Sequence, residues 1–156
     1  MKLHMINKSI TPLFLFLFSM SSLFGADWPM WGKDGSRNMV SDEKNITFDF
    51  TAGEMSDDEV VDMKTTKNLK WVAKLGSQAY GNVTIGNGCV FVGTNNESPR
   101  DPGKKGDRGV VMCLDEKSGE LKWQLVIPKL GAGKVSDWEY IGICSSTAID
   151  GDKVYV

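Results

Sequence analysis

Residues 109–123 read GVVMCLDEKSGELKW, an apolar run followed by a polar turn and a second run that ends on tryptophan. The apolar runs predict strands at residues 109–115 and 120–127, and residues 116–119 between them predict a tight turn. Within that turn, the side chains of Asp115 and Ser118 are able to bond to nearby backbone N–H groups. Gly119 permits the sharp bend, so the stretch as a whole predicts a β-hairpin.

Similar short runs, bounded by turn residues, continue on both sides of this hairpin, and this pattern is typical of an all-β fold. Gly86-Asn87-Gly88 and Asp150-Gly151-Asp152 predict two further tight turns. We expect the remaining strands at 69–75, 82–85, 89–94, 144–149 and 153–156. Residues 27–68 predict an irregular, largely polar extension with one short helix at about residues 56–63.

The chain also contains an internal repeat. Leu69-Lys70-Trp71 recurs as Leu121-Lys122-Trp123, 52 residues later, and residues 85–92 recur as residues 149–156, 64 residues later. A repeated unit of roughly 40 to 60 residues made of short strands predicts the four-stranded antiparallel blades of a β-propeller. Residues 69–156 would then form about one and a half blades, so we expect the chain to be the N-terminal part of a larger protein.

The hairpin resembles the tryptophan-docking motif of pyrroloquinoline-quinone-type (PQQ-like) propeller repeats. The matching residues are Cys113, Asp115, Ser118, Gly119 and Trp123, with Cys113 in a position that is usually alanine. The resemblance implies a propeller in which Trp123 packs against the neighbouring blade. This family includes quinoprotein dehydrogenases and the BamB group of outer-membrane assembly factors, so its members are both catalytic and non-catalytic.

Two functions therefore stay open. We expect a binding or scaffold module, and the alternative is a PQQ-dependent dehydrogenase that oxidises an alcohol or a sugar. The sequence shows no cofactor site, and PQQ and Ca²⁺ follow only from the alternative. The adjacent-cysteine pair of many such dehydrogenases is absent, and no residue matches their cofactor or calcium ligands.

Residues 1–26 predict a signal peptide, and hence a periplasmic or secreted protein. Lys2 and Lys8 precede an apolar stretch centred on residues 13–18, and Gly25-Ala26 supplies small residues for cleavage. Position 26 is Ala where a lipoprotein has Cys, so we expect no lipid anchor, in contrast to the BamB group. No later segment is apolar for long enough to predict a membrane span.

Composition excludes several other classes. The only histidine, His4, lies in the signal peptide, which excludes a Ser-His-Asp triad or His-ligated zinc in the mature residues. Removing Lys2 and Lys8 from 18 basic residues leaves 16 against 20 acidic ones, which predicts no nucleic-acid partner. Cys89, Cys113 and Cys144 lie among apolar residues and predict buried thiols, with one disulfide left open.

Strand order places the long connections of the predicted blade at one end of it. These are residues 76–81, 95–108 and 128–143, and long loops on a rigid scaffold commonly carry binding. We expect a protein, small-molecule or carbohydrate ligand at this end. Trp138 and Tyr140, which flank Glu139, would either contact such a ligand or close the loop onto the propeller. The candidate residues of this end are Arg100, Asp101, Lys104, Lys105, Asp107, Arg108, Trp138, Glu139 and Tyr140.

Overall fold

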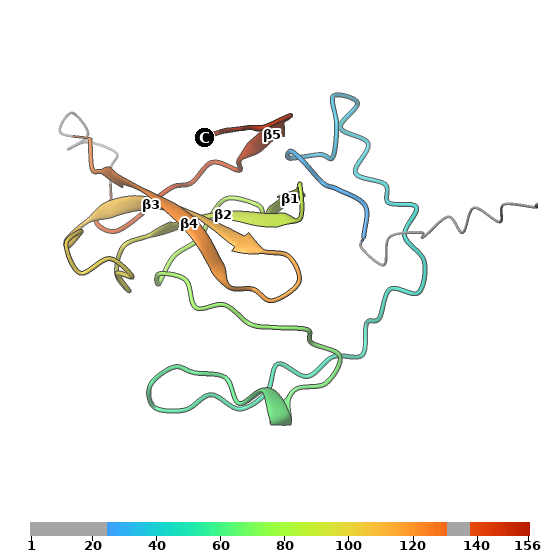
Figure 1. Cartoon of the computed structure of the whole chain (residues 1–156), viewed down its shortest axis with the longest axis horizontal. Coiled ribbons are helices and arrows are strands. Elements are labelled where there is room, and N and C mark those ends of the chain that lie inside the picture. Colours follow the sequence, from blue (N-terminus) through green and yellow to red (C-terminus); the bar gives the residue numbers. More distant parts are fainter. Residues whose placement is uncertain (1–24, 131–137) are drawn as a thin grey trace, which may run out of the picture.

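A computed structural model describes residues 25–130 and 138–156, and these residues form antiparallel β-structure with one 3-10 turn (Figure 1). The expected all-β class is confirmed for this part of the chain. The elements are η1 (Met63–Thr65), β1 (Thr84–Gly86), β2 (Cys89–Asn95), β3 (Arg108–Asp115), β4 (Leu121–Pro128), β5 (Ala148–Asp150) and β6 (Lys153–Tyr155).

The main sheet contains β1, β2, β3 and β4 in chain order, each antiparallel to the next. Asn87 and Gly88 connect β1 to β2 with φ angles of 55° and 68°, as a two-residue hairpin turn requires. The four strands expected in this region are confirmed, with ends that differ by one or two residues. A register shift between Cys113 and Leu114 leaves Lys122 as an extra residue in β4, which is a β-bulge.

One face of the main sheet carries the larger hydrophobic core. Its buried side chains are Val90, Val92, Val110, Met112 and Leu114. Trp71, Ala73 and Leu75 pack onto this face from the segment that precedes β1. Burying these apolar side chains on both sides of the contact supplies the main driving force for holding that segment on the sheet.

The prediction of a strand at residues 69–75 is wrong, because no strand occurs there in the described chain. Burial does alternate along the segment, with Trp71, Ala73 and Leu75 turned inward and Val72 and Lys74 exposed. Its alternation therefore suits a strand, but no described strand lies alongside to complete a ladder of backbone hydrogen bonds. The prediction followed the side-chain pattern, and a strand also needs a neighbour.

The opposite face of the main sheet is covered in part by a second sheet, made of β5 and β6. Cys89, Phe91 and Cys113 are buried there, and Ile149 and Val154 of the second sheet pack against them. The expected strands at 144–149 and 153–156 are shorter than predicted, since β5 begins at Ala148 and β6 ends at Tyr155. Figure 1 shows β5 above β1 and β2 in the view.

Positions related by the 64-residue repeat face each other across the two sheets. The Asn87 side chain donates to the Gly151 carbonyl over 2.8 Å, and the Asn82 backbone N–H donates to the Ser146 hydroxyl over 2.8 Å. The buried hydroxyls of Thr84 and Thr147, which are 63 residues apart, are also hydrogen-bonded to each other. The two copies of the repeated sequence therefore stack side by side with the same orientation.

The N-terminal extension meets both sheets through its first residues. Trp28 exchanges two backbone hydrogen bonds with Ile85 of β1, at 2.8 and 2.9 Å, and the Pro29 carbonyl accepts from the Ile149 N–H of β5 over 2.7 Å. The helix expected at 56–63 is wrong: Ser56 and Val60 close a turn, and Met55 bridges to Val61. The only helical turn described is η1.

Candidate functional site

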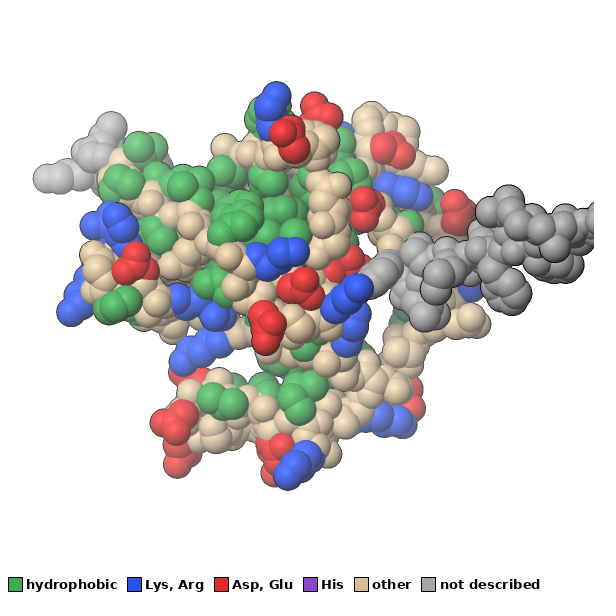
Figure 2. Space-filling view, in the orientation of Figure 1, with side chains coloured by type: hydrophobic (Ala, Val, Ile, Leu, Met, Phe, Trp, Pro, Cys, Tyr) green, Lys and Arg blue, Asp and Glu red, His purple; other side chains and the backbone are tan. Residues whose placement is uncertain are grey.

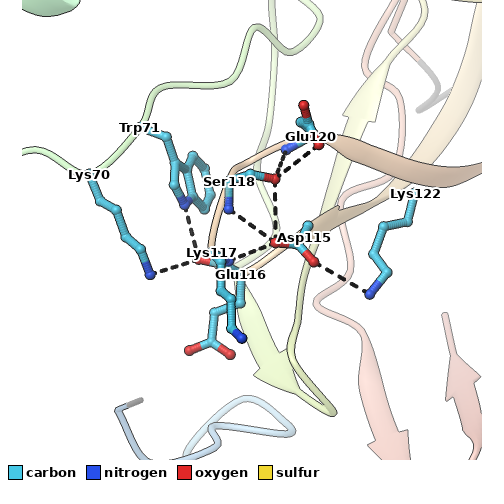
Figure 3. A network of polar contacts seen from close by, with 8 residues as sticks. All are labelled: Lys70, Trp71, Asp115, Glu116, Lys117, Ser118, Glu120 and Lys122. Atoms are coloured by element: carbon cyan, nitrogen blue, oxygen red, sulfur yellow. Dashed lines mark hydrogen bonds and ion pairs between the residues drawn. The ribbon is translucent and has the colours of Figure 1, made fainter. Parts of the chain in front are cut away.

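The turn between β3 and β4 is held by the carboxylate of Asp115 (Figure 3). Asp115 Oδ1 accepts hydrogen bonds from the backbone N–H groups of Lys117 and Ser118, at 2.9 and 3.0 Å, and from the Ser118 hydroxyl at 3.3 Å. The Gly119 N–H closes the turn onto the Asp115 carbonyl over 2.8 Å. These hydrogen bonds stabilise the charged form, so the N–H groups of Ser118 and Lys117 hold the pKa of Asp115 below its usual value.

Trp71 is the tryptophan that docks onto this turn. Its indole Nε1 donates to the Glu116 carbonyl over 3.0 Å, and Lys70 Nζ donates to the same carbonyl over 3.3 Å. The ring lies directly on Gly119, where an added Cβ would approach Trp71 Cδ2 to 2.5 Å. Gly119 also has a φ of 74°, so two independent constraints require glycine at this position.

Trp123 lies elsewhere, on the face of the sheet that carries Phe91 and Cys113. It is 44% exposed, and its ring centroid is 5.8 Å from that of Phe91. Cys113, its partner in the register, is completely buried. Docking of Trp123 on a neighbouring blade therefore stays a prediction. The docking of Trp71 on the turn was not predicted from the sequence. The signal that could have found it is the repeat, since Trp71 is the counterpart of Trp123.

The long connections do converge at one end of the main sheet, where Asn95 joins them. Asn95, at the end of β2, is buried, and its Nδ2 donates to the Ser77 hydroxyl over 2.9 Å and to the Tyr140 carbonyl over 2.6 Å. Its Oδ1 accepts from the backbone N–H groups of Ser77 and Glu97, at 3.0 and 3.2 Å. One side chain thus fixes segments from before β1, between β2 and β3, and after β4.

Asp107 forms a second junction at this end. Its Oδ2 accepts from Lys129 Nζ over 2.7 Å and from the Tyr140 N–H over 3.0 Å. Lys129 also donates to the Trp138 carbonyl over 3.0 Å. Lys129 and then the Tyr140 N–H hold the pKa of Asp107 below its usual value. These hydrogen bonds therefore anchor the backbone around Trp138. The Trp138 side chain is nevertheless 75% exposed, and the neighbouring Glu139 is exposed too.

The other candidate residues of this end lie in the connection between β2 and β3, except Arg108, which begins β3. Arg100 donates to the Lys74 carbonyl over 2.6 Å, Arg108 Nε donates to the Lys105 carbonyl over 2.9 Å, and Asp101 accepts from the Gly103 N–H over 2.9 Å. Asn96 is buried and donates to the Lys104 and Gly106 carbonyls, at 2.6 and 3.1 Å. The connection is therefore internally braced, and its charged side chains surround a fixed backbone.

A groove of about 900 Å³ separates the N-terminal extension from the segment that covers the main sheet. Figure 2 shows this hollow below the main body of the molecule. Glu59 and Lys74 pair across it over 2.7 Å, and Lys74 holds the pKa of Glu59 below its usual value. Its apolar walls include Met55, Val60 and Val72, all exposed. No pattern in the sequence predicts this groove.

Among the described residues, no three His, Cys, Asp or Glu side chains are grouped so as to hold a metal ion. No helix within the same residues is long and apolar enough to cross a membrane. No family model matches the chain, and comparison with curated proteins and with solved structures gives no match either.

Proposed function

We propose that the two sheets are blades of an exported β-propeller of the PQQ-like repeat type, and that it serves as a binding or scaffold module. The observation that carries the propeller proposal is the docking of Trp71 on the turn at Asp115–Gly119. The docked tryptophan belongs to the repeated Leu-Lys-Trp sequence, and the turn belongs to the motif that resembles this family. Stacking of the two repeat copies, with Asn87 against Gly151, is the arrangement that adjacent blades require.

Binding is assigned to the end of the main sheet where the long connections meet. Asn95 and Asp107 hold these connections in place, so a ligand would meet a preorganised surface and lose little affinity to loop ordering. The exposed indole of Trp138 offers a flat apolar surface for a sugar ring or an apolar peptide side chain. Glu139 and the charged residues of the connection between β2 and β3 supply hydrogen-bonding groups around it.

The test screens the purified chain against an array of oligosaccharides and a library of displayed peptides. The binding of any ligand that the screen identifies is then measured again with Trp138, Glu139 and Tyr140 replaced together by alanine. The matched control replaces Asn87 and Lys117 at the opposite end of the sheet. We expect the first variant to lose binding and the control to keep it, with circular dichroism showing that both are folded.

Loss of binding in the control alone would overturn the assignment to the loop end. The quinone-dependent alternative is tested separately by adding PQQ and Ca²⁺. A new visible absorbance band, together with reduction of a dye in the presence of an alcohol or sugar, would favour a dehydrogenase over a binding module.

A further inference from the structure

A cluster of two thiols, an ammonium and a carboxylate lies at the turn end of the main sheet. Cys89 begins β2 directly opposite Asp115 of β3, and Cys113 is two residues before Asp115 on the same face. Lys122 Nζ lies 3.6 Å from Asp115 Oδ2 (Figure 3). Cys89, more than Asp115, raises the pKa of Lys122, and Lys122 and Asp115 line the same cavity.

The β-bulge explains why these groups meet. Lys122 is the extra residue of the bulge, so its side chain escapes the strict alternation of β4 and turns toward the face that carries Cys113 and Trp123. In a regular strand, Lys122 and Trp123 would point to opposite faces. The bulge thus brings a positive charge to Asp115, the register partner of Cys89, and such re-aimed side chains are common next to functional sites.

The two thiols differ in access. Cys113 is completely buried, and burial together with the neighbouring Cys89 raises its pKa to about 12. Cys89 is 9% exposed, and its chain neighbour Gly88 and its register partner Asp115 line a cavity of about 880 Å³. The cavity is lined by Gly88, which precedes Cys89, and by Asp115 and Lys122, which flank it. A small reagent therefore reaches Cys89 first, and Cys113 only through Cys89.

We propose that Cys89 is a thiol-modification site for low-molecular-weight disulfides, and that Cys113 resolves the adduct to a reversible Cys89–Cys113 disulfide. In the first step the Cys89 thiolate attacks one sulfur of the reagent, RS–SR, and the departing thiolate takes up the proton that Cys89 gave up. In the second step Cys113 gives up its proton, which is slow because burial raises its pKa, and its thiolate attacks the Cys89 sulfur. The second RS group then leaves as RSH with that proton. Two protein thiols are oxidised, and one reagent disulfide is reduced to two thiols.

The sheet geometry favours a reversible bond over a permanent one. Cys89 and Cys113 occupy diagonal positions on adjacent strands, for which the Cα atoms are typically about 7–8 Å apart. Disulfides usually span Cα separations of up to about 6.8 Å, so closing this one requires a local shift of about 1 Å. Such strain makes a disulfide easier to reduce.

The test uses the full chain with Cys144, the exposed cysteine, replaced by serine. The reduced protein is incubated with oxidised glutathione and followed by intact-mass spectrometry. We expect one glutathione adduct, followed by a species two hydrogen masses lighter than the reduced chain. A non-reduced peptide map should join the peptides of Cys89 and Cys113, which tests the pairing without further substitution.

Substitutions then separate the two steps. Cys113→Ala should stop at the adduct, and Cys89→Ser should give neither product. Lys122→Met should slow adduct formation several-fold, and Lys122→Arg should restore it, because the positive charge lines the cavity and attracts the anionic glutathione disulfide. The proposal is overturned if the folded chain forms no adduct, or if it reacts only in urea. It is equally overturned if Cys89→Ser forms the adduct at the original rate.

Discussion

Replacing Gly119 by alanine tests the contact between Trp71 and the turn that it covers. The new methyl group would lie 2.5 and 2.6 Å from Trp71 Cδ2 and Cε3, so the indole would have to move off the turn. A left-handed backbone conformation costs a non-glycine residue roughly 1–2 kcal/mol, and φ is 74° here. Displacing the ring adds to this cost most of the free energy of unfolding that Trp71 contributes.

That contribution is estimated from large-to-small core substitutions. Truncating a core tryptophan to alanine costs about 3–5 kcal/mol, and Trp71 is only partly buried, so about 3 kcal/mol is expected for Trp71→Ala. Trp71→Phe keeps an aromatic ring but loses the hydrogen bond to Glu116, which is worth about 1 kcal/mol. Gly119→Ala should therefore cost about 3–5 kcal/mol, more than the backbone term alone.

Gly88 provides the matched control. Its φ is 68°, close to that of Gly119, but nothing lies within 4 Å of an added Cβ. Gly88→Ala should cost only the backbone term of roughly 1–2 kcal/mol. In a Trp71→Ala background, Gly119→Ala should fall to the same value, because the clash has been removed.

The assay is urea unfolding followed by circular dichroism, which does not depend on the number of tryptophans. Equal losses for Gly119→Ala and Gly88→Ala would refute the packing of Trp71 on the turn. Strict additivity of Gly119→Ala and Trp71→Ala would refute it too.

Three further outcomes are expected. Iodide should quench Trp123 fluorescence more than Trp71 fluorescence, because Trp123 is 44% exposed; single-tryptophan variants measure this. Mass spectrometry of protein exported from the producing cell should find Asp27 as the N-terminal residue, and an intact Met1 or a lipid-modified N-terminus would contradict this prediction. The stability that Asp107 contributes should be complete above its unfolded pKa, near 3.8, and should be lost as the pH falls through its lower folded value. Acid titration of Asp107→Asn should lack that part of the loss.

Local chemistry accounts for the parts of the fold that the sequence predicts well. The turns at Asn87-Gly88 and Asp115–Gly119 form because their own residues supply positive φ or a side-chain acceptor. The strands beside them follow from apolar runs that bury each other. The turn contacts join residues close together in the chain, where a sequence pattern carries most of the information.

The features that the sequence did not predict depend on contacts between segments that lie far apart in the chain. Trp71 reaches a carbonyl 45 residues away, and nothing local distinguishes it from Trp123 as the tryptophan that covers this turn. The bulge at Lys122 depends on how β4 aligns with β3, so the sequence does not predict the pairing of Lys122 with Asp115. Residues 69–75 are the clearest example. Their burial alternates as in a strand, but a strand also needs a neighbouring strand with which to pair, and the sequence pattern of the segment does not show whether one is present.

The two proposed sites lie at opposite ends of the main sheet. The thiol pair is at the turn end, where β3 finishes at Asp115, and the loop end begins where β3 starts at Arg108. Eight residues of strand separate the two ends by about 25 Å. No charge introduced at Cys89 would act strongly over that distance in salt, so oxidation could reach the loop end only by sliding β3 against β2. The Asn95 and Asp107 junctions oppose such sliding, and the structure therefore predicts that oxidised and reduced chains bind a loop-end ligand equally well.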